Sequence, residues 1–400
     1  MTGTHNPLKL AVIAGEPSGD LLGAELIAAL KARLDGRKIE LVGVGGEAMA
    51  GQGLKSLFDY HDLSIVGISA VVAQLPRLLS HIRTATRAIV DARPDLLVVI
   101  DSPAFSHRVA RKVRKRLPNL PVINYVCPSV WAWRPHRAKQ MTAYIDHILS
   151  ILPFEPKVVA DLGGPPLTYV GHRLASDPAL LKATENQKSR QLSKPKPDEL
   201  VSEAPLCLLL PGSRRGELKR LLPDFSKVVE ILAARTPGIR FQIATLPRLE
   251  STIRPIVSDW SVPVAITTDS QDKWTALSEA DVALAASGTV LLELAIAGVP
   301  CVSIYRLDAM TKPFEHLVTT WTAALPNLVV DHPVINEYVN ENIRPGLIAR
   351  RLERLLHGSA ERQTMLAEFE NVRAAMQTEQ PPAELAAEVV SDLLQKSGHR

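Results

Sequence analysis

The chain has 400 residues, more than one compact core usually holds, so we expect two domains. Hydrophobic residues make up 46%, charged residues 22% and the mean hydropathy is +0.06, which excludes a disordered chain and a polytopic membrane protein. The net charge of +4 is too small to indicate nucleic-acid binding by itself, and three widely spaced cysteines provide neither a disulfide framework nor a metal clamp.

The first nine residues lack the apolar segment of a secretory signal, which favours a cytoplasmic location. Short β-branched runs then recur along the chain, with helical patterns between most of them. The predicted strands are Leu8–Ala14, Glu40–Val44, Leu96–Ile100, Val122–Val126, His147–Leu152, Leu206–Leu210, Arg240–Ala244, Val282–Ala285 and Cys301–Tyr305. This alternation predicts the α/β class, with doubly wound parallel sheets covered by helices on both faces.

A polar segment, Asp177–Pro205, separates the two groups of strands and is interpreted as a loop or linker. Each half then has the size of an ordinary α/β domain. The apolar tract Val282–Tyr305 is interrupted by Glu293 and by turn residues, so we expect buried α/β structure there and no membrane span. The chain beyond Arg344 has a helical pattern with a break at Pro381-Pro382.

The first strand ends in Ala14–Asp20, whose glycines and Ser18 leave backbone N–H groups for an anion or a sugar hydroxyl. Glu16 adds a carboxylate, so Glu16, Ser18 and Gly19 are candidate site residues. The alternative is a plain strand-to-helix turn in which Ser18 caps the helix.

Asp101 follows the strand Leu96–Ile100 and should lie at the carboxyl edge of the sheet, where active sites of this fold class are found. It is our candidate general base. The alternative is a helix cap.

Charge is distributed unevenly. The segment 102–145 has nine Lys and Arg and no acid, so the rest of the chain is net negative. The segment 63–90 also lacks acids and is rich in Ile, Val and Leu. An apolar strip beside a basic one suits an anionic lipid surface or a phosphorylated amphiphile. A buried helix with a solvated basic face is the alternative, and no motif supports nucleic-acid binding.

Trp131 and Trp133 would share one face of an extended segment that ends at Arg134. The two indoles could wall a sugar or acyl pocket, or pack in the core.

In the second half, Gly212, Ser213 and Arg214 follow a buried strand and precede a helix, offering backbone donors and a guanidinium to a diphosphate. A second such turn, Ser287-Gly288-Thr289, precedes a helix that carries Glu293 one turn in. Phosphates at the helix start and ribose hydroxyls on the carboxylate would account for a buried glutamate that otherwise lacks a partner. The sequence holds no standard metal-site motif.

Nine strings of this sequence match a known family in order. They are Ala14–Asp20, Val42–Gly46, Ile100–Pro103, Pro128–Arg134, Leu152–Glu155, Val170–His172, Leu210–Arg214, Ala286–Thr289 and Leu325–Leu328. From about residue 8 to at least residue 330 the chain resembles the bacterial lipid-A-disaccharide synthases of glycosyltransferase family 19.

The resemblance implies a GT-B fold, two Rossmann-like domains with the active site in the cleft between them. Residues 1–172 would bind the acceptor and lipid, and residues 173–400 the UDP-sugar, with C-terminal helices that cross back or exchange within a homodimer. The implied reaction is inverting and needs no metal or cofactor. It joins UDP-2,3-diacylglucosamine to the 6-hydroxyl of 2,3-diacylglucosamine 1-phosphate (lipid X), giving the β-1,6 lipid A disaccharide 1-phosphate and UDP. The implied location is peripheral, on the cytoplasmic face of the inner membrane, with lipopolysaccharide biosynthesis as the context.

On this resemblance Asp101 is the base with Glu16 in reserve, while Arg214 and Ser287–Thr289 stabilise the leaving diphosphate. Glu293 would hold the ribose, and Asn327 would line the nucleotide pocket. The chain departs from the commoner family pattern at Ala70, where many members have Glu, and at Ala104 and Ser106, where Asp and then Asn or Thr are usual.

Two other functions remain open from the sequence. One is a GT-B enzyme that acts on another acceptor, or a UDP-sugar epimerase. The other is a non-catalytic binder of nucleotide sugars or anionic lipids.

Overall fold

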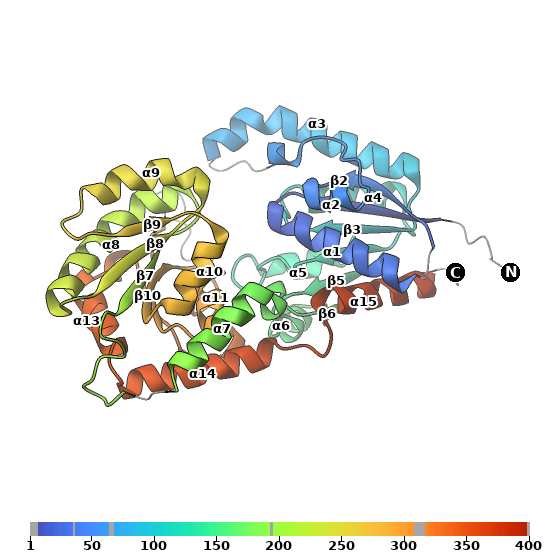
Figure 1. The fold of residues 1–400 in the computed structure, drawn as a ribbon. Coiled ribbons are helices and arrows are strands. Elements are labelled where there is room, and N and C mark those ends of the chain that lie inside the picture. Colours follow the sequence, from blue (N-terminus) through green and yellow to red (C-terminus); the bar gives the residue numbers. More distant parts are fainter. Residues whose placement is uncertain (1–6, 35–36, 64–67, 193–194, 308–316, 398–400) are drawn as a thin grey trace. The chain divides into compact units, whose positions relative to one another are not determined.

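The structure is a computed structural model that describes residues 7–34, 37–63, 68–192, 195–307 and 317–397. Residues 64–67 and the side chains of residues 68–74 lie outside this description, and with them the first part of the apolar strip expected over 63–90. The chain forms two compact units (Figure 1). Unit 1 comprises residues 1–172 together with 378–400, and unit 2 comprises residues 173–377.

Unit 1 is built on a six-stranded parallel sheet in the order β2-β1-β3-β4-β5-β6. The strands are β1 (Leu8–Ala14), β2 (Ile39–Val44), β3 (Leu96–Ile100), β4 (Val122–Tyr125), β5 (His147–Ser150) and β6 (Leu167–Tyr169). In register, Ala14 pairs with Ile100, so the residues that follow β1 and β3 leave the sheet side by side. The strand order reverses at this pair, which is where ligands bind in doubly wound sheets.

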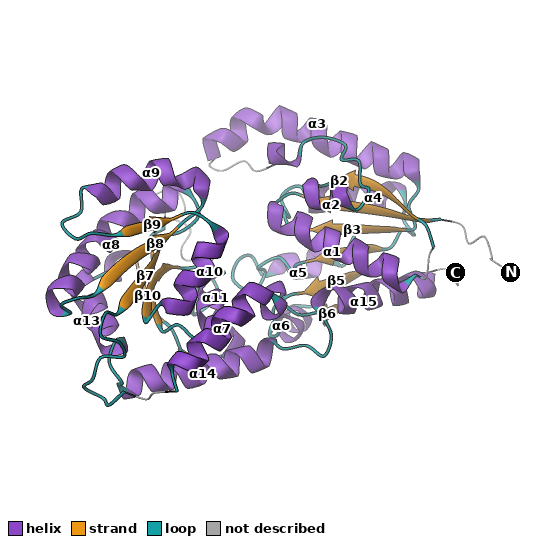
Figure 2. Ribbon diagram, in the orientation of Figure 1, coloured by secondary structure: helices purple, strands orange, loops and turns teal. Residues whose placement is uncertain are grey.

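Helices cover both faces of the unit 1 sheet (Figure 2). The helices are α1 (Pro17–Arg33), α2 (Glu47–Gly51), α3 (Ile68–Ala92), α4 (Ser106–Arg116), α5 (His136–Met141), α6 (Glu155–Asp161) and α15 (Pro382–Ser397). One buried cluster packs α1, α2 and α15 against the sheet, and a second cluster packs α3, α4, α5 and α6 against it. The C-terminal helix α15 packs on α1, so the last segment of the chain completes the first unit.

The acid-free segment 102–145 includes helix α4, which has one buried and one basic face. Val109, Ala110 and Val113 are buried in the core. Arg108, Arg111, Lys112, Lys115 and Arg116 are exposed. The basic stretch of the sequence is therefore a solvated face at this helix.

Unit 2 contains a second six-stranded parallel sheet, in the order β12-β11-β10-β7-β8-β9. Its strands are β7 (Leu206–Leu210), β8 (Arg240–Ala244), β9 (Ala265–Thr267), β10 (Val282–Ala286), β11 (Cys301–Tyr305) and β12 (Asn336–Val339). The order reverses between β7 and β10. The tract Val282–Tyr305 forms β10, a helix and β11, as expected, and no helix in the described parts of the chain is both long and apolar enough to span a membrane.

The helices of unit 2 pack on both faces of its sheet (Figure 2). They are α7 (Pro178–Arg190), α8 (Arg215–Arg235), α9 (Pro247–Ser258), α10 (Ser270–Glu279), α11 (Val290–Ala297), α12 (Leu325–Val330), α13 (Pro345–Leu355) and α14 (Ala360–Met376).

The interpretation of Asp177–Pro205 as a loop is wrong for its first half, which is helix α7. Asp177 caps this helix by accepting hydrogen bonds from the N–H groups of Ala179 and Leu180. Its buried face contacts α10 and α11, where Gln187 donates to the carbonyls of Leu277 and Ala280. This buried face combines side-chain hydrogen bonds with a few apolar contacts. The segment therefore lacks the regular pattern of large apolar residues from which a packed helix is usually predicted.

Three strands were not predicted: β6, β9 and β12. Each has three or four residues and is only partly buried or exposed. All three lie at sheet edges, where a short strand shows no clear hydrophobic alternation.

Candidate functional site

A cavity of about 760 Å³ lies in unit 2 at the carboxyl ends of β7, β8 and β10. Leu210, Ala244 and Ala286, the last residues of these strands, contribute to its wall. The cavity includes the point between β7 and β10 where the strand order reverses, the usual ligand site of such a sheet. It brings together Gly212, Ser213, Arg214, Ser287, Gly288, Thr289 and Glu293 from the sequence prediction.

One end of the cavity is the start of α8. Gly212 has φ 110°, a conformation that favours glycine, and an added Cβ would lie 2.5 Å from Glu217 Oε2. Ser213 N–H donates to Glu217 Oε2 at 3.1 Å, and Arg214 Nη1 donates to Oε1 at 3.0 Å. Glu217 was not singled out from the sequence. It orients Arg214 at the helix start, while the guanidinium side chain stays 64% exposed.

The start of α11 forms another part of the wall. Thr289 stands at the cap position, but its side chain makes no cap hydrogen bond to this helix. Gly288 has φ 141°, and an added Cβ would meet no atom within 4 Å. Ser287 Oγ donates to the carbonyl of Ala323 at 3.1 Å, which fixes the turn. The N–H groups of Leu291 and Leu292 donate to the carbonyls of Gly288 and Thr289, so the donors offered to the cavity are those at Gly288 to Val290, which line it.

In the described part of the chain, α8, α9, α10 and α11 each begin after a strand at this edge, and α9 and α10 leave fewer N–H groups for an anion. Helix α9 begins with Pro247, which has no N–H, so this helix start has one donor fewer. Helix α10 is capped by Asp269, whose Oδ1 accepts from Gln271 N–H. The starts of α8 and α11 lack a side-chain cap at the cap residue, so an anion in this cavity is best placed between those two.

Glu293 has a partner that the sequence did not reveal. Lys273 Nζ lies 2.6 Å from Glu293 Oε2, and both residues line the cavity. The expectation of a buried carboxylate without a partner is therefore wrong, because α10 supplies a lysine. Lys273 and Glu293 lie on two different helices, α10 and α11, so no residue spacing within one element indicates that the two side chains form a pair.

Asn327 is placed differently from the expectation. It is not among the described residues that line the cavity, and its side chain is buried. Its Oδ1 accepts from Val334 and Ile335 N–H, and its Nδ2 donates to the Ile335 carbonyl and to Thr322 Oγ1. The amide therefore holds the chain around α12 in shape, and a direct nucleotide contact would have to replace one of these bonds.

In unit 1, Asp101 and the Ala14–Asp20 turn lie together at the sheet edge. A Cβ added to Gly19 would lie 3.6 Å from Asp101 Cβ, and one added to Gly15 would lie 2.4 Å from Ser102 Oγ. Asp101 has φ 53°, and its Oδ1 accepts from Ser102 N–H at 2.8 Å. It is half-buried, whereas Glu16 and Ser18 are exposed. An aspartate in a strained left-handed conformation at the switch point is typical of a functional position.

Asp20, the other carboxylate of this turn, has a structural role. It is buried, and its oxygens accept from the N–H groups of Gly46, Ala48 and Met49. It caps α2, which explains the acid at this position without a ligand.

The indoles of Trp131 and Trp133 do not share the face of an extended segment, because residues 129–133 form a turn. The N–H groups of Ala132 and Trp133 both donate to the Ser129 carbonyl. Trp131 is directed to α6, where it packs edge-on against Phe154 with ring centroids 5.2 Å apart. The guanidinium of Arg134 lies 5.0 Å from the centre of the Trp133 ring. A Trp133–Arg134 pair therefore takes the place of the expected indole pair.

The comparisons with known proteins identify the family. A family model described as lipid-A-disaccharide synthetase matches residues 10–390. A lipid-A-disaccharide synthase from Rhodopseudomonas palustris (strain BisB18) is 43% identical over 393 residues, 98% of this chain and 97% of that protein. One from Bradyrhizobium diazoefficiens is 41% identical over 399 residues, 99% of each. The chain belongs to the lipid-A-disaccharide synthase family. It is accordingly a glycosyltransferase of lipid A biosynthesis, as the resemblance implied.

Solved structures show the fold expected for this family. A UDP-GlcNAc 2-epimerase from Neisseria meningitidis bound to UDP-GlcNAc has a TM-score of 0.57 and 13% identity, covering 97% of this chain and 100% of that chain. Acinetobacter baumannii MurG has a TM-score of 0.53 and 16% identity, covering 98% and 100%. These similarities show the fold alone, which is GT-B with two Rossmann-like domains.

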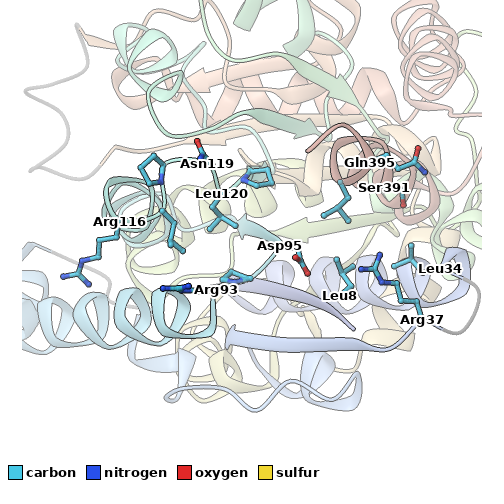
Figure 3. Close-up of a pocket in the computed structure, with 15 residues that line it drawn as sticks. Leu8, Leu34, Arg37, Arg93, Asp95, Arg116, Asn119, Leu120, Ser391 and Gln395 are labelled. Carbon is cyan, nitrogen blue, oxygen red and sulfur yellow. The ribbon is translucent and has the colours of Figure 1, made fainter. Parts of the chain in front are cut away.

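A second cavity, of about 680 Å³, lies in unit 1 at the amino ends of the strands, opposite to the edge where Asp101 lies (Figure 3). Arg93 and Arg116 lie toward one end of it, and Arg37 toward the other. Helices α1, α4 and α15 end here, so their partial negative charge faces this edge. This cavity therefore suits a diphosphate less well than the one in unit 2. Among the described residues, no group of three or more His, Cys, Asp or Glu could hold a metal ion.

Glu155 is a buried carboxyl group beneath the Trp131 turn. It is 2% exposed, accepts from Trp131 Nε1 at 3.1 Å, and accepts from Ser150 Oγ at 2.5 Å. Burial raises the pKa of Glu155 to about 7, because the hydrogen bonds from Ser150 and Trp131 only partly offset the loss of water. Glu155 ends one of the strings that match the family, but the sequence alone indicates no role for it.

Replacing Glu155 by glutamine should stabilise the protein at alkaline pH. The folded pKa lies above the unfolded one, so ionisation costs stability as pH rises from about 4.5 to about 7, and the cost remains above pH 7. Glutamine can still accept from Trp131 and can donate to Ser150 Oγ. In urea unfolding, the free-energy difference between variant and wild type should grow by about 2–3 kcal/mol from pH 5 to pH 8. Asp392→Asn, at an exposed position of α15, is the control and should show no such growth, and a constant difference for Glu155→Gln would contradict the assignment.

Proposed function

We propose that this chain transfers 2,3-diacylglucosamine from UDP to the 6-hydroxyl of 2,3-diacylglucosamine 1-phosphate, with inversion at the anomeric carbon. The observation that carries the proposal is the unit 2 cavity, where two helix starts and Arg214 can receive a diphosphate. The family membership supplies the lipid A context.

In the proposed reaction, the bond from the anomeric carbon to the diphosphate oxygen breaks and a bond to the acceptor O6 forms. Asp101 takes the proton of the 6-hydroxyl on its Oδ2, since Oδ1 accepts from Ser102 N–H. Negative charge moves onto the leaving UDP, where Arg214 and the N–H groups at Ser287–Thr289 stabilise it. Glu293 binds the ribose hydroxyls. Glu16, exposed near Asp101, is the second candidate for the base.

Substrate contacts in unit 1 are proposed at two places. Ser18 and Gly19 offer the start of α1 to the acceptor phosphate, since no side chain caps that helix. Trp133 and Arg134 offer an aromatic face and a charge to the acceptor sugar.

Both proposed substrates carry acyl chains, so the enzyme must reach a membrane surface. Leu75 and Leu79 of α3 are 40% and 39% exposed, and α4 presents its basic face to solvent. This combination suits an anionic lipid surface. We place the protein peripherally on the cytoplasmic face of the inner membrane, and a homodimer remains a prediction.

The direct test is to incubate the purified protein with both acylated substrates in detergent micelles and follow the products by mass spectrometry and NMR. The proposal expects equal amounts of UDP and a β-1,6-linked disaccharide 1-phosphate. UDP binding without any disaccharide would favour a non-catalytic binder. Consumption of soluble UDP-N-acetylglucosamine without lipid would instead favour an epimerase.

A further inference from the structure

Every charged side chain that lines the described wall of the unit 2 cavity has a partner on its own chain. Arg214 pairs with Glu217, Lys273 pairs with Glu293, and Asp269 accepts from the N–H of Gln271. The wall therefore carries three carboxylates and two cations. A nucleoside diphosphate adds at least two negative charges, so its binding requires these cations to be shared with it.

Lys273 is placed to be shared. It lies on α10 and is 30% exposed, and its Nζ lies 2.6 Å from Glu293 Oε2 and 4.8 Å from the centre of the Trp274 ring. Glu293 Oε2 is buried and has no hydrogen-bond partner among the described residues, so its contact with Lys273 is an ion pair whose angles fall outside those of a hydrogen bond. The ammonium group thus has N–H donors available for another acceptor.

The partner of Lys273 lies near the anion position. Glu293 is the fourth residue of α11, and Thr289 stands just before this helix. One helical turn rises about 5.4 Å, so the Glu293 backbone lies about one turn from the start of α11, and Lys273 lines the same cavity as both residues. A lysine is a point charge on a flexible stem, so it can cover this span while the α10 backbone stays in place.

We propose that Lys273 is a further binding residue of this cavity, contacting the diphosphate of the donor while it still holds Glu293 Oε2. The inference rests on the proposed function, because it assumes a uridine diphosphate ligand. Glu293 Oε1 is then the oxygen that remains for the ribose. The competing explanation is that Lys273 only neutralises Glu293 and never meets the ligand.

A double-mutant cycle separates these explanations. We would measure dissociation constants for UDP by calorimetry and for uridine by competition, using wild type, Lys273→Met, Glu293→Gln and the double variant. Lys273→Met is expected to weaken UDP binding about 10- to 50-fold and uridine binding less than about threefold, because uridine has no phosphate. In the Glu293→Gln background the loss for UDP should persist, since a phosphate contact does not need the carboxylate.

Two further variants control the experiment. Lys273→Arg should retain most of the UDP affinity, because it keeps the charge. Lys219→Met, on the exposed side of α8 and outside the cavity wall, should bind UDP as wild type does.

Equal losses for UDP and uridine would overturn the inference, and so would a Lys273→Met effect that vanishes beside Glu293→Gln. Either result would make Lys273 a counter-ion only. If wild type itself fails to bind UDP, the proposed function fails as well, so the two failures are distinguishable.

Discussion

Replacing Asp101 by asparagine is expected to lower turnover by about 10²- to 10⁴-fold while changing the dissociation constant for UDP by less than about twofold. Asparagine is chosen because Asp101 has φ 53°, a left-handed conformation that asparagine adopts more easily than alanine. The variant therefore removes the basic oxygen with little added backbone strain. Steady-state formation of disaccharide and calorimetry with UDP measure the two quantities.

Asp95 provides a matched control at the other end of the same strand. It directly precedes β3, whereas Asp101 directly follows it, and its Oδ2 accepts from Lys9 N–H at 2.8 Å. Asp95→Asn should keep turnover within about threefold of wild type. If Asp101→Asn is equally active, the base lies elsewhere, and Glu16→Gln becomes the next variant to measure.

Replacing Arg214 by methionine should lower kcat/KM for the donor by about 10²- to 10³-fold, as expected when a charged donor to a leaving group is lost. Part of this loss should appear in kcat, because the charge on the diphosphate grows as the glycosidic bond breaks. Methionine keeps most of the side-chain length, so the helix start retains its packing. Initial rates at several donor concentrations separate kcat from KM.

The neighbouring Arg215 is the control for Arg214. It is the first residue of α8, is exposed, and does not line the cavity. Arg215→Met should change kcat/KM by less than about threefold. Comparable losses in both variants would indicate a general electrostatic effect and would contradict a direct contact from Arg214.

The positions of the site motifs follow from the sequence, because each motif comes directly after a buried strand. Gly212–Arg214 follow β7 and Ser287–Thr289 follow β10, and neighbouring parallel strands deliver these turns to one edge. Gly15 meets Ser102, and Gly19 meets Asp101, for the same reason after β1 and β3. Strand identity and strand order therefore explain most of the predicted site.

The partners of the site side chains could not be predicted, because they come from elements distant in sequence or from backbone groups. Lys273 reaches Glu293 from another helix, and Asp20 caps a helix that begins at Glu47. Asn327 was assigned to the nucleotide pocket through the family resemblance, but groups of its own chain fill the four hydrogen-bonding sites of its amide. Sequence spacing identifies which turns meet, whereas only coordinates show which polar groups are already paired.

The most direct test of the proposed donor site is a crystal structure of the protein with UDP bound. The nucleotide is expected in the unit 2 cavity, with the diphosphate within hydrogen-bond distance of Arg214 and of backbone N–H groups at Gly288 to Val290. UDP bound instead in the cavity between Leu8 and Leu120 of unit 1, with the unit 2 cavity empty at saturating nucleotide, would contradict it.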